Sequence, residues 1–359
     1  MTTNTGTVTL NLTFPSIGIY SSCQVAIRDH AGNYSNRQWL DTVRNDPYRV
    51  CGHPSLTIPQ AECSALVDLY QGTLGSGRTN STNRLTHSDP EQRYGLTLSG
   101  GRTRQVDLNG NNLVGTVPAS FGVLTGLDLI YMYRNTNLGG TLDVFSGMKN
   151  LVTLKLFRSE FSGNLNNLIP LTKIQTLDIG YTRVYGNLSA LSGMNNLSTL
   201  YLELEYAPGV QGDLKNFAHM QNLADININT PNQPITGGTI TTYVTGNLAH
   251  MSGMVANARL NIEGPGVHSD EFFGSVDVFS GKSLYRARRI SNGNITGDLR
   301  VFSGQDIKYA HFDGTHITGN VNSINRRSDT WSIDLQDTNV GGDITYLSGK
   351  YTSLGVFAI

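Results

Sequence analysis

The chain has 359 residues, of which 15% are charged, and its 26 basic and 27 acidic residues leave a net charge of −1. A chain this close to neutral produces no long-range attraction toward nucleic acid or an anionic membrane, so neither is expected as a partner. No apolar run approaches the roughly 18 residues of a membrane-spanning helix. The hydrophobic content of 38% suffices for a packed core, and the 40 glycines indicate many turns.

The N-terminal segment, residues 1–56, has the patterning of a small β-rich element. Four of its apolar residues alternate with polar ones, as in a half-buried strand: Val8, Leu10, Leu12 and Phe14. The chain starts with neither a basic segment nor a continuous apolar stretch, so no secretion signal is expected. Two interpretations stay open for this element: an extra cap on the fold that follows, or an anchor that docks the protein to a larger assembly.

Residues 57–105 are interpreted as a second N-terminal unit that begins with a helix. Pro59 suits the first position of a helix, and Leu66, Leu69 and Tyr70 mark one apolar helical face. The chain has three cysteines, too few for a disulfide framework, and no Cys/His cluster has the spacing of metal ligands.

From residue 106 to residue 359 the chain is repetitive. A five-residue signature, apolar–x–Gly–x–apolar, recurs ten times around Gly115, Gly140, Gly163, Gly186, Gly212, Gly246, Gly274, Gly297, Gly319 and Gly342. The intervals between these glycines are 22 to 26 residues, except for two longer ones of 34 and 28. A fixed period of this length is typical of a solenoid, in which similar coils stack on one another.

Each repeat combines a short strand with a helical turn. Most signatures are preceded by two apolar residues two apart, such as Leu177 and Ile179, which is the period of a strand. They are followed by apolar pairs three apart, which suit a 3₁₀ turn: Leu142/Phe145, Leu188/Leu191, Val276/Phe279, Leu299/Phe302 and Ile344/Leu347. We expect parallel strands near 106–108, 130–132, 154–156, 177–179, 200–202, 226–228, 310–312 and 333–335, and hence an α/β solenoid.

The first full unit, VDLNGNNLVGTVPASFGVLTGLDLI, resembles the plant-type consensus of the leucine-rich repeat family, LxLxxNxLxGxIPxxLxxLxxLxxL. The resemblance covers about residues 58–359. It implies ten to eleven coils with a parallel concave β-sheet and a convex side of short helical, 3₁₀ or loop segments. Asn111 stands at the position that caps the turn in this family, and residues 57–105 match its N-terminal cap. Glu91 and Leu98 stand where the family has cap cysteines, so no cap disulfide is expected here.

Aromatic and charged residues stand at the outward positions of repeats two to five. They are predicted to form a binding surface on the concave face: Tyr131, Tyr133, Arg134, Lys155, Phe157, Arg158, Asp178, Tyr181, Tyr201 and Glu203. Tyrosine and arginine are enriched among the residues that dominate binding energies. An alternative stays open, in which the aromatic side chains only stabilise one another across neighbouring strands.

No catalytic motif is present, so we expect a protein that is not an enzyme and needs no cofactor or metal. His311 and His316 flank Asp313 in a pattern that could suggest a metal ligand set. His311 is expected to face outward from a strand and His316 to lie in a turn, and both are interpreted as surface residues.

The C-terminal end of the repeat array has the pattern of an eleventh strand without a polar cap. A last coil needs its apolar face covered, so Val356, Phe357 and Ile359 are predicted to make assembly contacts together with Val8, Leu10, Leu12 and Phe14. A homo-oligomer or a larger assembly is therefore expected.

We expect a binding or structural protein whose concave face contacts a protein or a surface glycan. The favoured interpretation is a virion-associated appendage of a bacteriophage, a head or tail fibre, made in the host cytoplasm. Two alternatives stay open: a bacterial cell-surface or secreted adhesin, and an intracellular scaffold.

Overall fold

The computed structural model describes residues 19–25, 38–44, 51–52, 56–82, 93–207, 209–229, 243–254, 259–263, 272–282, 289–291, 294–305, 309–324, 332–343, 345 and 356–358. Of the predicted assembly residues, Val8, Leu10, Leu12, Phe14 and Ile359 lie outside these ranges. Val356 and Phe357 are described only as parts of a strand backbone. No helix within the described ranges is both long and apolar enough to cross a bilayer.

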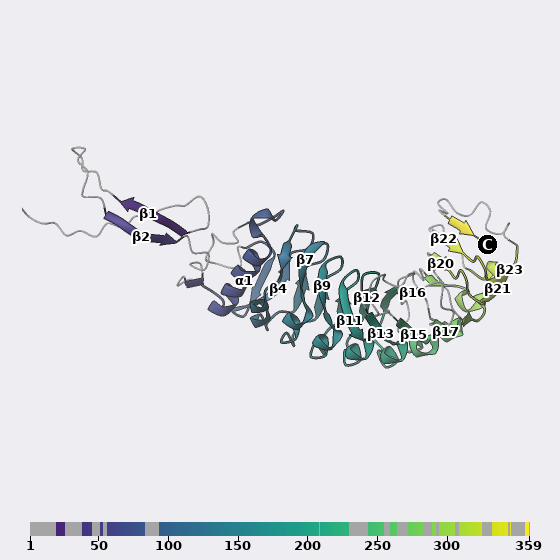
Figure 1. Ribbon diagram of the computed structural model, residues 1–359. Helices are drawn as coiled ribbons and strands as arrows, with labels where there is room; N and C mark the ends of the chain where they lie inside the picture. Colours follow the sequence, from purple (N-terminus) through teal and green to yellow (C-terminus); the bar gives the residue numbers. More distant parts are fainter. Residues whose placement is uncertain are drawn as a thin grey trace, which may run out of the picture.

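The repeats stack into a curved solenoid with a parallel sheet along its concave side, as predicted (Figure 1). Eight strands of this sheet lie side by side in chain order: β4 (Arg102–Asp107), β6 (Leu129–Tyr131), β8 (Thr153–Lys155), β10 (Thr176–Asp178), β12 (Thr199–Glu203), β14 (Asp225–Asn229), β16 (Arg259–Glu263) and β18 (Arg289–Ser291). A second parallel sheet follows, made of β20 (Tyr309–His311), β22 (Ser332–Asp334) and β24 (Val356–Ala358). Many strands begin a residue or more before the predicted position.

A further parallel sheet, which the sequence did not predict, runs along the glycine signatures. Its strands are β5 (Val114–Thr116), β7 (Asn137–Thr141), β9 (Glu160–Asn164), β11 (Arg183–Asn187), β13 (Gly209–Asp213), β15 (Tyr243–Asn247), β17 (Phe272–Ser275) and β19 (Asn294–Thr296). The strands β21 (Thr318–Asn320) and β23 (Asn339–Gly341) form a parallel pair of the same kind. Each of these coils therefore hydrogen-bonds to its neighbours along two lines.

The signature glycine is required by the close approach of successive coils. Gly212 has φ +150°, and a Cβ atom there would lie 2.7 Å from the Cβ of Leu188 in the preceding coil. From η6 to η12, the residue after the glycine caps the 3₁₀ helix that follows with its side chain. The side chain of Asn187, for example, accepts a hydrogen bond of 2.9 Å from the backbone N–H of Ser189.

Short 3₁₀ helices follow the capping residues, as the apolar pairs predicted. They are η4 (Ala119–Val123), η5 (Leu142–Phe145), η6 (Leu165–Leu168), η7 (Leu188–Leu191), η8 (Leu214–Phe217), η9 (Leu248–Met251), η10 (Val276–Phe279), η11 (Leu299–Phe302) and η12 (Val321–Ser323). Four of the five predicted pairs coincide with the ends of such a helix, and Ile344/Leu347 includes residues outside the described ranges.

The core lies between the concave sheet and the 3₁₀ helices. Leu154, Leu177 and Leu200 occupy paired positions on β8, β10 and β12, and all three side chains are fully buried. These rows of leucine pack coil against coil, so each coil depends on its neighbours for its core.

Buried polar side chains close the turn after several of the concave strands, including β4, β6, β8 and β10. The amide of Asn135 donates to the carbonyls of Leu108 and Met132, both at 2.9 Å, and accepts from the N–H groups of Asn111 and Leu113, both at 3.0 Å. In the next two coils a hydroxyl takes the place of the amide and donates to the carbonyl three residues earlier. Ser159 donates to Leu156, and Thr182 donates to Ile179.

The N-terminal end of the solenoid is covered by α1 (Gln60–Gly72), η2 (Gly75–Gly77) and β3 (Leu96–Ser99), which pairs antiparallel with β4. The buried carboxylate of Glu62 binds the Arg102 side chain and accepts from the N–H of Thr103 at 2.9 Å. Upstream, β1 (Ile19–Val25) and β2 (Gln38–Arg44) form an antiparallel pair.

One expectation about this cap is wrong. Cys51 and Cys63 form a disulfide, with their Cα atoms 5.5 Å apart. The expected absence rested on the residues at positions 91 and 98, whereas the bond joins α1 to a residue upstream of it. It thus ties the helix to the chain that leads into the cap. Arg93, which is buried, lies with both terminal nitrogens 3.7 Å from the Cys63 sulfur.

Candidate functional site: an aromatic and basic patch on the concave sheet

The residues predicted to bind a partner line up across the first half of the concave sheet. Tyr131 on β6 pairs with Lys155 on β8, Lys155 pairs with Asp178 on β10, and Asp178 pairs with Tyr201 on β12. Residues in one row of a parallel sheet are about 4.8 Å apart, so neighbouring side chains contact one another. The predicted register of outward residues is therefore reproduced for this row.

Two groups of rings and cations form beside the row. Lys155 Nζ lies 5.3 Å from the ring centre of Tyr131, which meets Tyr133 edge-on at 5.9 Å. Phe157 and Tyr181 also meet edge-on, at 5.4 Å. The guanidinium of Arg158 covers both of these rings, 5.2 Å from Phe157 and 5.3 Å from Tyr181.

A neighbouring tyrosine, which the sequence analysis missed, extends the surface. The ring of Tyr206 lies 5.8 Å from that of Tyr181, and 53% of the Tyr206 side chain is exposed. It was missed because it stands in LELEYAPG, an irregular unit without a clear strand pattern at this position. We call the set the aromatic–arginine patch: Tyr131, Tyr133, Arg134, Lys155, Phe157, Arg158, Tyr181 and Tyr206.

Three members of the aromatic–arginine patch have left-handed backbone. Arg134, Arg158 and Tyr181 have φ of 58°, 55° and 52°, and they occupy the same position in three successive coils. The equivalent positions in other coils are Gly110, Gly314 and Asp337, with φ of 53°, 66° and 56°. At this position the backbone N–H donates to a carbonyl of the next coil: Gly110 to Tyr133, Arg134 to Phe157, Arg158 to Gly180, Tyr181 to Glu203 and Gly314 to Gln336.

A hollow of about 490 Å³ opens at the C-terminal edge of the patch. Its lining includes Arg158, Tyr181 and Tyr206 from the patch, together with the exposed ion pair of Glu160 and Arg183. The hollow therefore combines ring faces with both signs of charge.

The other three predicted residues are not part of the aromatic–arginine patch. Asp178 is only 8% exposed. Tyr201 donates to Asp225 at 2.5 Å, and Glu203 accepts from Asn227 at 2.6 Å. Tyr201 and Glu203 thus tie neighbouring coils together. The ladder that begins at Glu203 continues to a further coil, because the amide of Asn261 donates to Asn227 at 2.6 Å.

The buried position of Asp178 changes its acidity. Burial raises the pKa of Asp178 to about 6, although the N–H of Gly180 and the charge of Lys155 act in the opposite direction. Burial, followed by the negative charges of Glu205 and Glu203, also raises the pKa of Tyr181. The patch is consequently beside a carboxylate whose pKa is raised to about 6.

Comparisons with known proteins agree with this architecture. No protein-family model matches the chain. Receptor-like protein 39 of Arabidopsis thaliana is 31% identical over 103 residues, which are 28% of this chain and 12% of that protein. A plant ice-binding protein of known structure matches 84% of this chain and 96% of its own, with a TM-score of 0.57 and 16% identity. The fold is a leucine-rich repeat solenoid.

The leucine-rich repeat ectodomain of the receptor kinase SOBIR1, also from Arabidopsis thaliana, matches 46% of this chain and 90% of its own, with 23% identity and a TM-score of 0.38. The chain spans about one eighth of the length of the curated relative that it matches. Within this leucine-rich repeat solenoid, the aromatic–arginine patch lies on the concave side of coils two to five.

Proposed function

We propose that this leucine-rich repeat solenoid is a non-enzymatic recognition protein that binds a protein partner through its aromatic–arginine patch. The observation that carries the proposal is the left-handed backbone of Arg134, Arg158 and Tyr181. A residue other than glycine costs roughly 1–2 kcal/mol in this conformation. Gly110 and Gly314 show that the coil forms with glycine at this position. Three successive coils carry this backbone cost. The cost is explained if the three side chains are kept because they contact a partner.

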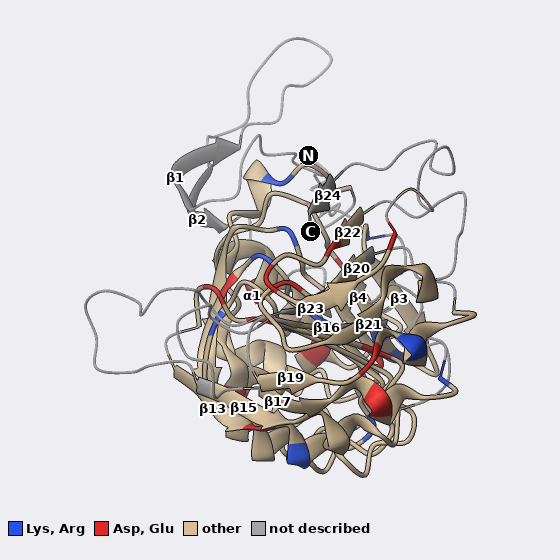
Figure 2. Ribbon diagram, turned by 90° about the vertical axis from the view of Figure 1, so that its right-hand side faces the viewer, with Lys and Arg blue, Asp and Glu red and all other residues tan. Residues whose placement is uncertain are grey.

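The chemistry of the patch supports a protein partner. Its rings and guanidinium groups provide large contact area with few rotatable bonds, which is typical of the anchors of protein interfaces. Acidic and basic residues are interspersed over the described coils (Figure 2), so contact within the patch matters more than long-range attraction. A glycan would need free polar groups, whereas the amides of Asn227 and Asn261 already serve the ladder between coils. Binding of a glycan stays a prediction.

We propose that the protein works in an oxidising location. The Cys51–Cys63 disulfide supports this, because such bonds persist at cell and virion surfaces and are rare in the cytosol. It disfavours the intracellular scaffold. The virion appendage and the homo-oligomer stay predictions, since the predicted anchor residues lie outside the described ranges.

The proposal is tested by replacing Arg158 with glycine. The change relieves the left-handed backbone and removes the guanidinium from the rings of Phe157 and Tyr181. Peptides are first selected on the wild-type protein from a random display library, and their affinities are then measured for wild type, Arg158→Gly and Arg300→Ala. Arg300 is an exposed arginine of the 3₁₀ helix η11 and serves as a control of equal charge change.

We expect Arg158→Gly to weaken the selected peptides at least tenfold, while its unfolding free energy stays at or above that of wild type. Arg300→Ala should bind like wild type. The proposal fails if the selected peptides bind Arg158→Gly and the double variant Tyr133→Ala/Phe157→Ala as they bind wild type. It also fails if no peptide is selected.

A further inference from the structure

Three side chains with metal-binding chemistry converge on the concave side of the last described coils. They are His311 at the end of β20, Asp313 two residues later and Asp334 at the end of β22. His311 and Asp334 are paired across the two strands. One donor atom from each of the three residues lies within 4.8 Å of the others. All three residues are partly buried.

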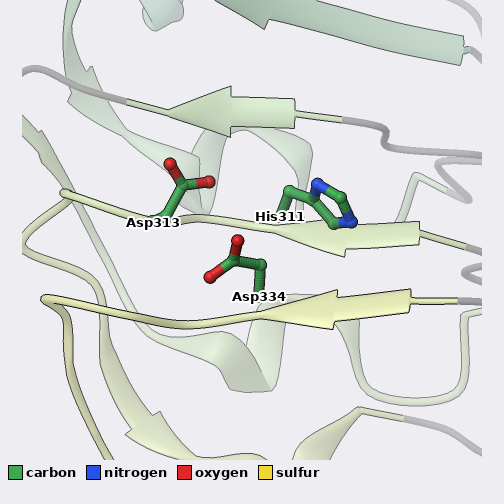
Figure 3. Close-up of side chains that lie close together, drawn as sticks. All are labelled: His311, Asp313 and Asp334. Carbon is green, nitrogen blue, oxygen red and sulfur yellow. The ribbon is translucent and has the colours of Figure 1, made fainter. Parts of the chain in front are cut away.

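The coils bring together residues that are separate in sequence. Figure 3 shows the three side chains on one face of the neighbouring strands, with the Asp334 carboxylate turned toward the strand that carries the other two. A metal ion about 2.1 Å from each donor holds the donors at most about 4.2 Å apart. Small side-chain rotations therefore close the group around an ion.

The imidazole of His311 is positioned from outside the group. Its Nε2 lies 2.8 Å from the hydroxyl of Ser332, a largely buried residue that precedes Asp334 on β22. A hydrogen bond to one ring nitrogen orients the imidazole, as the outer partners of metal-bound histidines do. Ser332 therefore belongs to the arrangement as an orienting residue.

We propose that His311, Asp313 and Asp334 form a binding site for a divalent transition-metal ion, with Zn²⁺ as the best match. One imidazole and two carboxylates suit Zn²⁺ better than Mg²⁺ or Ca²⁺, which take oxygen ligands alone. Three protein ligands leave at least one coordination position of Zn²⁺ open. This position faces the concave side of the solenoid and accepts a water molecule or a donor group of a bound partner. The site is separate from the aromatic–arginine patch and does not depend on its function.

Isothermal titration of the metal-free full chain with Zn²⁺ tests the proposal. We expect one Zn²⁺ per chain, displaced by a chelator and not by millimolar Mg²⁺. His311→Ala and Asp334→Asn should each weaken binding at least tenfold. His316→Ala is the matched control, because His316 is an exposed histidine of the same coil, outside the group. Its variant should bind Zn²⁺ like wild type.

A second measurement uses the wild-type protein and does not depend on the folding of variants. In NMR spectra with isotope-labelled histidine, substoichiometric Co²⁺ should broaden the ring signals of His311 and leave those of His316 sharp. The proposal is overturned if wild type binds no stoichiometric Zn²⁺, if His311→Ala binds as wild type does, or if Co²⁺ broadens all histidine signals alike.

Discussion

Lys155 and Asp178 stand opposite one another on neighbouring strands of the concave sheet, and the carboxylate is the more buried of the two. Burial outweighs the favourable charge of the lysine, so the pKa of Asp178 is raised to about 6. The acid is thus more easily protonated in the folded chain than in the unfolded chain. Its protonation links the stability of the patch region to pH.

The first prediction concerns this pH dependence. Because the folded-state pKa is raised above the ordinary value of 3.8, the native state binds more protons than the unfolded state between pH 4 and 6. The unfolding free energy should therefore fall as pH rises through this window and be level above it. Asp178→Asn should remove this decrease in unfolding free energy. The unfolding free energy of the variant minus that of wild type should therefore increase by roughly 1–3 kcal/mol from pH 4 to pH 7.5.

Urea unfolding at both pH values measures this difference. Asp143→Asn, the same charge change at an exposed residue of η5, is the control. Parallel pH profiles for wild type and Asp178→Asn would contradict the raised pKa.

The second prediction tests the register of the concave sheet. Leu177 is fully buried, whereas its neighbour Thr176 is partly exposed on the other face of β10. Leu177→Ala should lower the unfolding free energy by roughly 2–5 kcal/mol, and Thr176→Ala by less than about 0.5 kcal/mol. Chemical denaturation of both variants is the measurement. Equal losses would place the inward and outward residues one position away from those described.

The third prediction concerns the turn amide of Asn135. Its side chain satisfies four backbone groups of two coils. Asn135→Ala leaves them buried without that partner and should cost roughly 3 kcal/mol or more. Asn137→Ala, at an exposed position two residues later, should cost less than about 0.5 kcal/mol. A loss at Asn135 as small as that at Asn137 would mean that water replaces the amide.

The fourth prediction concerns the disulfide. Cys51→Ser should destabilise the oxidised protein by roughly 2–4 kcal/mol, because the bond restricts the unfolded chain. Thermal unfolding with and without reductant provides the readout. If reductant lowers the melting temperature of Cys51→Ser as much as that of wild type, another bond carries the effect.

The solenoid could be predicted from the sequence because each coil encodes its own strand and turn. The pair Leu142/Phe145 and the alternation at Leu177 and Ile179 depend only on neighbours in sequence. The sheet along the glycine signatures could not be predicted in this way. Its strands are as short as three residues and have no alternating pattern, since they form only when one coil stacks on the next.

The parts of the candidate site that the sequence missed depend on contacts between coils. Tyr206 joins the patch through a ring in the preceding coil, and His311 meets Asp334 only because the register of β20 and β22 pairs them. The prediction that the cap has no disulfide failed for a similar reason, because the sequence analysis places Cys51 in a segment separate from the cap.

The left-handed position at Arg134, Arg158 and Tyr181 bears on how such a surface changes over evolutionary time. The scaffold uses only the main-chain N–H of this residue, which donates to the next coil whether the side chain is glycine, arginine or tyrosine. Its side chain can therefore be exchanged without repacking the core. Each exchange away from glycine draws on a modest reserve of folding stability. The chain can thus diversify what it recognises one coil at a time, until that reserve limits the number of such positions.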